Sequence, residues 1–362
     1  MKIIVSAGGT GGHIYPALAI IEEFKKQEKD LEVLYIGTHN RMEKDIIPKH
    51  GIKYESITIY GFSKTMIKRN IKNIGYIVSS YNKCVNIMKE FKPDVVIGVG
   101  GYVTFPVIMA AKKMHIKTVI HEQNSVPGKA NKFLSASVDL ILTSFKDSNK
   151  YFKNKHVVYT GNPSGDNVKN LKSIDPSSYG LSKSKKKVLI TCGSLGSSGL
   201  NSKLIDYLND VKDYEVLFVT GKNNYEDMKK VINNKNVFLT PYINNQAGIL
   251  KNMDLIISRA GASTLAEIVE SLVPSLIIPS PYVSNNHQYY NALSLSEAGC
   301  VKMLEEKDLT KEILESSVEE LLNNNMLRAQ MKNSLRKNMI SNSSNIIYKE
   351  IKKIIWMNLE KY

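Results

Sequence analysis

Short runs rich in Val, Ile and Leu alternate with helical patterns along nearly the whole chain, and this alternation constrains the fold most strongly. The runs are mostly apolar throughout, rather than apolar at every second residue. Such strands are typical of a parallel sheet covered on both faces, and the β-α-β order predicts doubly wound α/β domains. The expected strands are residues 3–6, 33–36, 95–99, 118–121, 140–143, 157–160, 188–192, 216–220, 237–239, 255–258 and 276–279.

A weak internal repeat indicates two such domains. IIVSAGGTGGHIYPAL, from residue 3, resembles VLITCGSLGSSGLN, from residue 188, because each is an apolar strand, a Gly/Ser-rich turn and a helix start. The length of 362 residues also suits two domains of about 100–200 residues each. We expect a first Rossmann-like domain over 1–160 and a second over 161–340, with a polar linker near 161–186. The apolar-periodic helix in 341–362 is expected to pack back on the first domain.

Composition limits the class of protein. No run approaches the roughly 20 apolar residues of a membrane span, and the N-terminus lacks a signal-peptide pattern, so a cytoplasmic location is expected. The three cysteines are far apart without metal-ligand spacing, which predicts reduced thiols. The net charge of +15 favours an anionic partner, although a lysine-rich background explains it equally well. No aromatic platform or RNP motif accompanies the charge, so nucleic acid is not expected.

Four glycine-rich corners follow predicted strands, at residues 8–12, 98–102, 192–198 and 258–264. Glycines there let the backbone approach a ligand, and the next helix directs N–H groups and its positive dipole end at an anion. The first corner has neither a Walker A lysine nor the GxGxxG pattern, so a nicotinamide enzyme is not expected. Two domains that bring such loops face to face would suit a transferase with a donor and an acceptor.

Taken in order, these corners resemble the peptidoglycan N-acetylglucosaminyltransferases of the MurG family. The matching stretches are GGTGGHIYPA at 8–17, GVGGYVTFP at 98–106, HEQNSVPGKANK at 121–132, GNP at 161–163, CGSLGSSGLN at 192–201, SRAGASTLAE at 258–267 and NHQYYNA at 286–292. The resemblance implies a glycosyltransferase B fold and an inverting transfer of GlcNAc from UDP-GlcNAc. The acceptor would be the MurNAc 4-hydroxyl of lipid I and the product lipid II, which serves peptidoglycan synthesis, cell shape and cell division.

The same resemblance assigns the site in the first domain. His13 would be the general base, since imidazole accepts a proton near neutral pH, or would orient the acceptor; a helix N-terminal residue bonded to its own backbone is the structural alternative. The lipid pyrophosphate would be bound by backbone N–H groups of Gly11, Gly12, Gly100 and Gly101. The full set implied for UDP-GlcNAc is Thr10, Gly11, Gly12, Asn124, Ser194, Ile243, Glu267, Gln288 and Asn291.

In the second domain Ser194 would bind the donor diphosphate. No DxD motif follows a strand, so we expect no metal and no cofactor, with UDP-GlcNAc as a substrate. Glu267 would bind the ribose hydroxyls, yet Thr264 to Glu267 also fits a capping box. The backbone of Ile243 would read uracil.

Three further positions of the second domain stay open between binding and structure. Gln288 and Asn291 would bind GlcNAc hydroxyls or form a polar helix face. Arg259 would face phosphate or brace the fold. The family commonly has GNPVR at the domain junction, whereas here Gly165 stands in place of the arginine, so no phosphate-binding arginine is assigned there.

A basic, apolar segment precedes the third predicted strand. Residues 60–83 hold no acid, and apolar residues recur there at helical spacing. This predicts either an interfacial helix on the cytoplasmic face of an anionic membrane or an ordinary surface helix. The basic residues are Lys64, Lys68, Arg69, Lys72 and Lys83, and the apolar ones are Ile67, Ile71, Ile74, Val78 and Tyr81.

Wall-synthesis proteins are expected partners. The alternative functions are a diacylglycerol glycosyltransferase or a UDP-GlcNAc 2-epimerase of the same fold, or a polyanion-binding module.

Overall fold

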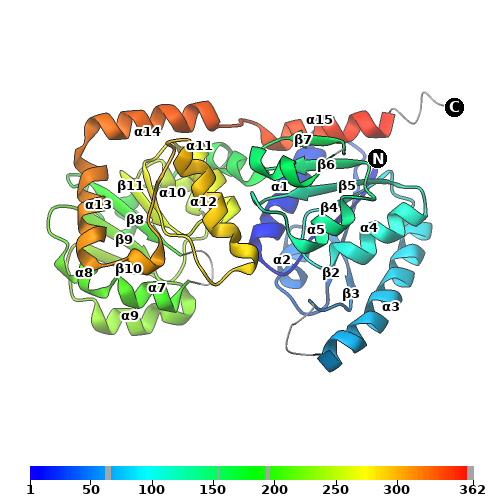
Figure 1. The fold of residues 1–362 in the computed structure, drawn as a ribbon, viewed down its shortest axis with the longest axis horizontal. Helices are drawn as coiled ribbons and strands as arrows, with labels where there is room; N and C mark the ends of the chain where they lie inside the picture. The colour runs from blue at the N-terminus through cyan, green and yellow to red at the C-terminus, as the bar shows by residue number, and fades with distance from the viewer. Residues whose placement is uncertain (62–66, 154, 193–195, 357–362) are drawn as a thin grey trace. The chain divides into compact units, whose positions relative to one another are not determined.

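The computed structural model describes residues 1–61, 67–153, 155–192 and 196–356, and the chain divides into two compact units. The first unit is Met1–Pro163 together with Asn342–Tyr362, and the second is Ser164–Ser341 (Figure 1). Each unit is built around one parallel sheet with helices on both faces. The predicted fold class, two Rossmann-like parallel-sheet domains, is confirmed.

The first unit contains a seven-stranded sheet in the order β3-β2-β1-β4-β5-β6-β7, in which all paired neighbours are parallel. Its strands are β1 Lys2–Ser6, β2 Glu32–Thr38, β3 Lys53–Ile57, β4 Val95–Gly98, β5 Lys117–Glu122, β6 Leu140–Thr143 and β7 Val157–Tyr159. Its α-helices are α1 Gly11–Gln27, α2 Glu43–Lys49, α3 Ile67–Phe91, α4 Thr104–Lys113, α5 Lys129–Leu134 and α15 Ser343–Trp356. The predicted strands are all present, and β3 is an additional strand.

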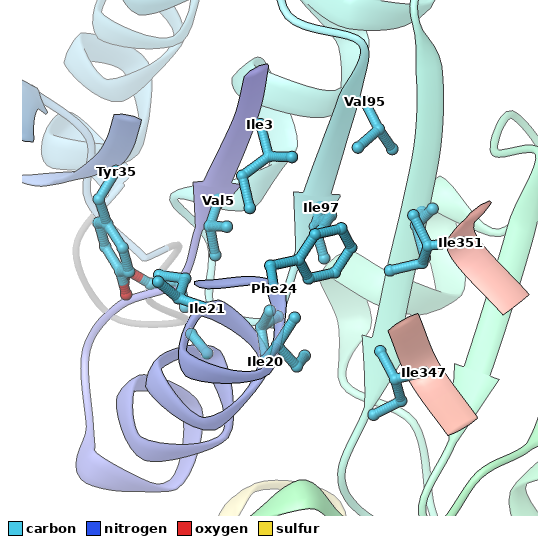
Figure 2. Close-up of a cluster of buried hydrophobic side chains, with 14 of the residues drawn as sticks. Ile3, Val5, Ile20, Ile21, Phe24, Tyr35, Val95, Ile97, Ile347 and Ile351 are labelled. Carbon is cyan, nitrogen blue, oxygen red and sulfur yellow. Dashed lines mark hydrogen bonds between the residues drawn. The ribbon is translucent and has the colours of Figure 1, made fainter. Parts of the chain in front are cut away.

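Helix α15 belongs to the core of the first unit although it comes last in the sequence. Ile347 and Ile351 are fully buried beside α1 and the sheet, as Figure 2 shows. The ring of Tyr348 meets Phe24 edge-on with centroids 5.0 Å apart, and Lys352 pairs with Glu28 of α1. Burying each isoleucine contributes about 1.5–3 kcal/mol, so α15 stabilises this unit mainly through its apolar face.

The second unit contains a six-stranded sheet in the order β10-β9-β8-β11-β12-β13, again parallel. Its strands are β8 Lys187–Thr191, β9 Glu215–Val219, β10 Val237–Thr240, β11 Leu255–Ser258, β12 Ser275–Ile277 and β13 Lys302–Met303. Its α-helices are α6 Asn167–Asn170, α7 Ser198–Lys203, α8 Ile205–Asp210, α9 Tyr225–Val231, α10 Gln246–Leu250, α11 Ala262–Ser271, α12 His287–Glu297, α13 Lys311–Asn323 and α14 Asn325–Asn338.

Candidate active site

The first two glycine corners lie against each other in the first unit. Strands β1 and β4 are parallel neighbours in which Ser6 is paired with Gly98, so both chains leave the sheet at the same edge. The N–H of Gly8 donates to the carbonyl of Gly100 at 3.3 Å. The two corners therefore form one surface, as expected for loops at the carboxyl ends of adjacent parallel strands.

Glu43, a buried carboxylate outside the matched motifs, fixes the conformation of the first glycine corner. Glu43 is fully buried on α2 and accepts hydrogen bonds from the N–H of Gly9 at 3.2 Å and from the N–H and hydroxyl of Thr38. It thereby ties the glycine loop to the end of β2. No local sequence pattern points to Glu43, since it lies on a separate helix 34 residues beyond Gly9.

His13 lies in the first turn of α1, and its ring has one fixed contact with the backbone. The distance between Nδ1 and the carbonyl oxygen of Gly8 is 3.1 Å. A carbonyl only accepts, so Nδ1 carries the hydrogen and, in the neutral ring, Nε2 carries the basic lone pair. The ring is thus bonded to the backbone, as the structural alternative expects. The same bond leaves the basic lone pair on Nε2, so it is compatible with the predicted role as a base.

The first turn of α1 offers backbone donors next to this ring. Thr10 is the N-cap residue and is exposed, as is Gly12, while Gly11 is half-buried. The first N–H groups of an α-helix have no partner within the helix and point outward with its positive dipole end. The surface formed by residues 8–12 and 100–101 thus has the chemistry of an anion site.

The HEQN stretch begins with the last two residues of β5, and its acidic and amide members have different surroundings. The carboxylate of Glu122 is buried and accepts from the N–H groups of Asn124 and Gly128 and from the amide of Asn131. Burial raises the pKa of Glu122 above its usual value, and these hydrogen bonds offset only part of that rise. Glu122 therefore organises the loop, Gln123 is buried, and Asn124 is half-buried with its side-chain amide bonded to Glu122.

The third corner lies in the second unit, and its predicted diphosphate ligand Ser194, with Gly193, lies outside the described residues. The described end of the loop is close-packed. Gly196 has φ of +72°, and a Cβ there would lie 2.4 Å from the carbonyl oxygen of Thr220, so only glycine fits. The amide of Asn201 donates to the same carbonyl at 2.9 Å. This places the end of β9 directly beside the corner.

Arg259 braces the second unit. Its Nη2 lies 2.6 Å from Oε2 of Glu306, and both side chains are buried. The same guanidinium donates to the carbonyls of Ile278 and Pro279 and to the hydroxyl of Ser197 at the start of α7. Of the two expected roles, the structure supports the brace, which ties the end of β12 to the third corner.

Glu267 lies inside α11, which begins at Ala262 with Gly261 as its N-cap. The capping-box alternative is therefore wrong, because Thr264 and Glu267 are both within the helix. Burial raises the pKa of Glu267 to about 8. A carboxyl group with this pKa is mostly protonated near pH 7 unless hydrogen-bond donors stabilise its ionised form.

The remaining predicted donor residues are found on loops and on α12. Ile243 is buried just beyond β10. Oε1 of Gln288 accepts from the N–H of Ser280 at 2.9 Å, which leaves its amide nitrogen as the donor end. Asn291 is fully buried and donates to the carbonyl of Ala260 at 3.2 Å, so it holds the fourth corner.

Gly165 is packed closely against α11. A Cβ at this position would lie 3.2 Å from the carbonyl oxygen of Ala266 on α11, closer than most side chains approach. The nearby cation, Lys169, forms an ion pair with Glu270.

No helix in the described ranges is long and apolar enough to cross a membrane. Within the same ranges, no group of three or more His, Cys, Asp or Glu side chains is arranged to hold a metal ion.

Comparison with known proteins defines the class. Residues 3–143 match the glycosyltransferase family 28 N-terminal domain, and residues 187–346 match the family's C-terminal domain. The crystal structure of Acinetobacter baumannii MurG superposes with a TM-score of 0.79 at 26% identity, covering 97% of this chain and 99% of that one. The UDP-GlcNAc 2-epimerase of Neisseria meningitidis, bound to UDP-GlcNAc, has a TM-score of 0.70 at 17% identity, covering 98% and 100%, and shares the fold alone. The chain is a family 28 glycosyltransferase of the two-domain B type.

One relative defines the family more narrowly. A Bacillus cytotoxicus protein is 43% identical over 362 residues, covering 98% of this chain and 100% of the relative. It is named UDP-N-acetylglucosamine–N-acetylmuramyl-(pentapeptide) pyrophosphoryl-undecaprenol N-acetylglucosamine transferase. This chain belongs to the same family, the MurG family, as its motifs predict.

Proposed function

We propose that this chain transfers GlcNAc from UDP-GlcNAc to the MurNAc 4-hydroxyl of undecaprenyl-pyrophosphoryl-MurNAc-pentapeptide, lipid I. The product is lipid II of peptidoglycan biosynthesis. The proposal rests mainly on the 43% identity, over nearly the full length, to the Bacillus cytotoxicus protein that is named for this transfer. The alternatives of epimerase and diacylglycerol glycosyltransferase have no comparable support, because the epimerase likeness is confined to the fold.

The chemical step is a single displacement at the anomeric carbon of GlcNAc. The acceptor hydroxyl oxygen forms the new bond to C1, and the bond between C1 and the β-phosphate oxygen breaks, its electron pair leaving with UDP. Nε2 of His13 takes the hydroxyl proton, a role supported by the Nδ1 contact with Gly8 that leaves Nε2 basic. One displacement inverts the configuration of C1.

The acceptor pyrophosphate binds to backbone N–H groups of Gly11, Gly12, Gly100 and Gly101. The contact between the two corners brings these glycines together, and the dipole of α1 places positive partial charge beside them, which supports this assignment. Glu43 supports the site indirectly, because its bond to the N–H of Gly9 holds the loop that presents these donors.

The donor is bound by Glu267 at the ribose, by the Ile243 backbone at uracil and by Ser194 at the diphosphate. The raised pKa of Glu267 supports the first assignment, since vicinal hydroxyls provide the donors that its carboxylate needs. We assign the amide nitrogen of Gln288 to the GlcNAc hydroxyls, whereas Asn291 acts by holding Ala260. Thr10 and Asn124 complete the set.

The chain works at the cytoplasmic face of the cell membrane, which its α3 surface contacts. One face of α3 is buried through Asn73, Ser80, Cys84 and Met88. The opposite face exposes the apolar side chains of Ile71, Ile74 and Val78, with exposed fractions of 65%, 57% and 56%. An apolar helix face in water, next to lysines, is typical of an interfacial helix.

Two of the residues expected in this segment are engaged within the first unit. Lys83 pairs with Glu55 at 3.4 Å and donates to the carbonyl of Ser56, so it is engaged with β3. Tyr81 packs against the core instead of solvent. Lys72 is exposed, whereas Lys64 and the side chains of Ile67, Lys68 and Arg69 lie outside the described residues.

A transfer assay with product analysis tests the function. Radiolabelled UDP-GlcNAc is incubated with a lipid I analogue, with diacylglycerol, or alone, and with EDTA in a parallel series. The proposal predicts label in the lipid I analogue only, with no effect of EDTA. Acceptor-independent formation of UDP-ManNAc would identify an epimerase instead, and label in diacylglycerol would identify a different lipid glycosyltransferase.

A further inference from the structure

The side-chain amide of Gln123 is locked in one orientation. Its nitrogen Nε2 lies 2.9 Å from the carbonyl oxygen of Val99, 3.1 Å from that of His121 and 3.0 Å from Nδ1 of His121. Carbonyl oxygens only accept hydrogen bonds, so the nitrogen must occupy this end of the amide. The oxygen Oε1 is consequently fixed at the other end.

His121 is itself fixed in protonation and tautomer. Its Nε2 lies 3.3 Å from the carbonyl oxygen of Gly161, so Nε2 carries the hydrogen and Nδ1 accepts from Gln123. Complete burial lowers the pKa of His121 to about 4, which keeps the ring neutral at physiological pH. The direction of each hydrogen bond is therefore fixed: His121 donates to the carbonyl of Gly161, and Gln123 donates to His121.

Oε1 of Gln123 is buried without a hydrogen-bond partner among the described residues. A buried oxygen without a donor has lost its hydration with nothing to replace it. It lies beside Gly100, where a built Cβ would be 3.2 Å from Oε1, 2.9 Å from Nε2 of His13 and 2.5 Å from Cδ2 of His13. The imidazole of His13 and the amide oxygen of Gln123 thus flank the same point, and glycine is the residue that leaves this point open.

We infer that Gln123 is a positioning residue whose amide oxygen stabilises the imidazolium of His13. The inference rests on the proposed function, in which Nε2 of His13 accepts the proton of the acceptor hydroxyl. The negative end of a fixed, buried carbonyl dipole beside the ring favours its charged form, and the low dielectric strengthens the effect. The proton moves from the hydroxyl to His13, and Gln123 stays neutral throughout.

The other titratable groups around this point are already bound in place. On α2, Glu43 is held by Gly9 and Thr38, and on β2 the hydroxyl of Tyr35 donates to the carbonyl of Ala7. Burial keeps the pKa of Tyr35 well above its usual range, so it stays neutral. On β5, His121 is neutral and Glu122 faces its own loop amides. Among these groups a change at Gln123 directly affects only His121, whose Nδ1 loses its donor. Gln123→Met and Gln123→Glu share that loss and differ in what replaces the amide oxygen, so comparing the two isolates the group beside His13.

Titration of His13 by NMR in the full chain, without substrate, tests the inference. The chain has 7 histidines, and the Cε1–H signal of His13 is assigned with a His13→Gln variant. Gln123→Met keeps the side-chain length and removes the carbonyl, so the titration midpoint moves to lower pH by about 0.5–1 unit. Gln123→Glu places a carboxylate there and moves the midpoint to higher pH.

Two readouts separate this role from a structural one. In Gln123→Met the acidic limb of kcat/KM moves to lower pH together with the NMR midpoint, and the plateau falls because a weaker base transfers the proton less well. An unmoved midpoint in a folded variant, either Met or Glu, overturns the inference. The NMR titration needs no turnover, so it stands or falls independently of whether the chain transfers GlcNAc.

Discussion

The ring of His13 packs directly against the backbone of Gly100, at a position where any Cβ would lie 2.5 Å from Cδ2 of the imidazole. Gly100 also has φ of +100°, in the region that favours glycine. The second glycine corner therefore does more than turn the chain, because it sets the distance between His13 and the residues beneath it.

Gly100→Ala is expected to lower kcat by roughly 10- to 100-fold, since the methyl group displaces the ring of His13. Gly51→Ala is the matched control, because Gly51 also has positive φ of +67° but nothing lies within 4 Å of its Cβ position. Both variants lose stability through backbone strain, which thermal unfolding measures. Equal kcat losses in the two variants would contradict the role of the ring contact.

UDP binding is expected to release a proton from Glu267. Its pKa of about 8 in the free protein leaves the carboxyl mostly protonated at pH 7, and ribose hydroxyls that donate to it favour the ionised form. Calorimetric titrations in buffers of different ionisation enthalpy should show close to one proton released near pH 7. In Glu267→Gln the release disappears, and UDP binds about tenfold more weakly.

The same pKa fixes how stability depends on pH. The pKa of Glu267 is raised on folding, so its contribution is fully present below about pH 4.5 and is lost as pH rises through about 8. Glu267→Gln should therefore gain stability relative to the native chain across this window. A constant stability difference from pH 4.5 to 8 would show that the carboxyl is not shifted.

Arg259→Met is expected to destabilise the second unit by about 3–5 kcal/mol, because Glu306 is left buried without its main partner. Thermal unfolding measures the loss. In the double variant Arg259→Met with Glu306→Leu, the loss is smaller than the sum of the two single losses. A normal melting temperature with weaker UDP-GlcNAc binding would instead favour the phosphate role.

Replacing Ile71 and Ile74 with Glu is expected to reduce binding to anionic vesicles by roughly tenfold or more, since each buried isoleucine contributes about 1.5–3 kcal/mol. Met326→Glu is the control, because Met326 is 73% exposed on α14 of the other unit. Vesicle sedimentation in low and high salt measures the binding. Equal binding of the native chain to neutral and anionic vesicles would contradict the electrostatic part of the proposal.

The fold was largely predictable because its buried strands are continuous apolar runs, whereas the two strands that sequence reasoning missed have a different pattern. β3 reads KYESI and lies at the edge of its sheet, so three of its five residues are polar. β13 contains only two residues, Lys302 and Met303, and is the edge strand beside β12 in the second unit. Edge strands need less apolar surface, which removes the signal.

The site was predictable where ligand contact requires glycine, and less so where support comes from distant residues. The corners are visible as runs of glycine, but Glu43 and Glu306 reach them from other elements through tertiary packing. Gln123 is buried next to half-buried Asn124, and only the structure shows that its amide nitrogen faces the carbonyl of Val99. Thr264 and Glu267 mislead locally, since their spacing imitates a cap inside a helix.

The most direct test of the central claim is the linkage formed from UDP-GlcNAc labelled at C1 and a lipid I analogue. Proton and carbon NMR of the purified product reads the configuration and position of the new bond. A single displacement by the MurNAc 4-hydroxyl predicts a β-linkage to C4, with the large H1–H2 coupling of an axial H1. An α-linkage, a bond to another hydroxyl, or label that stays in a nucleotide sugar would contradict the account.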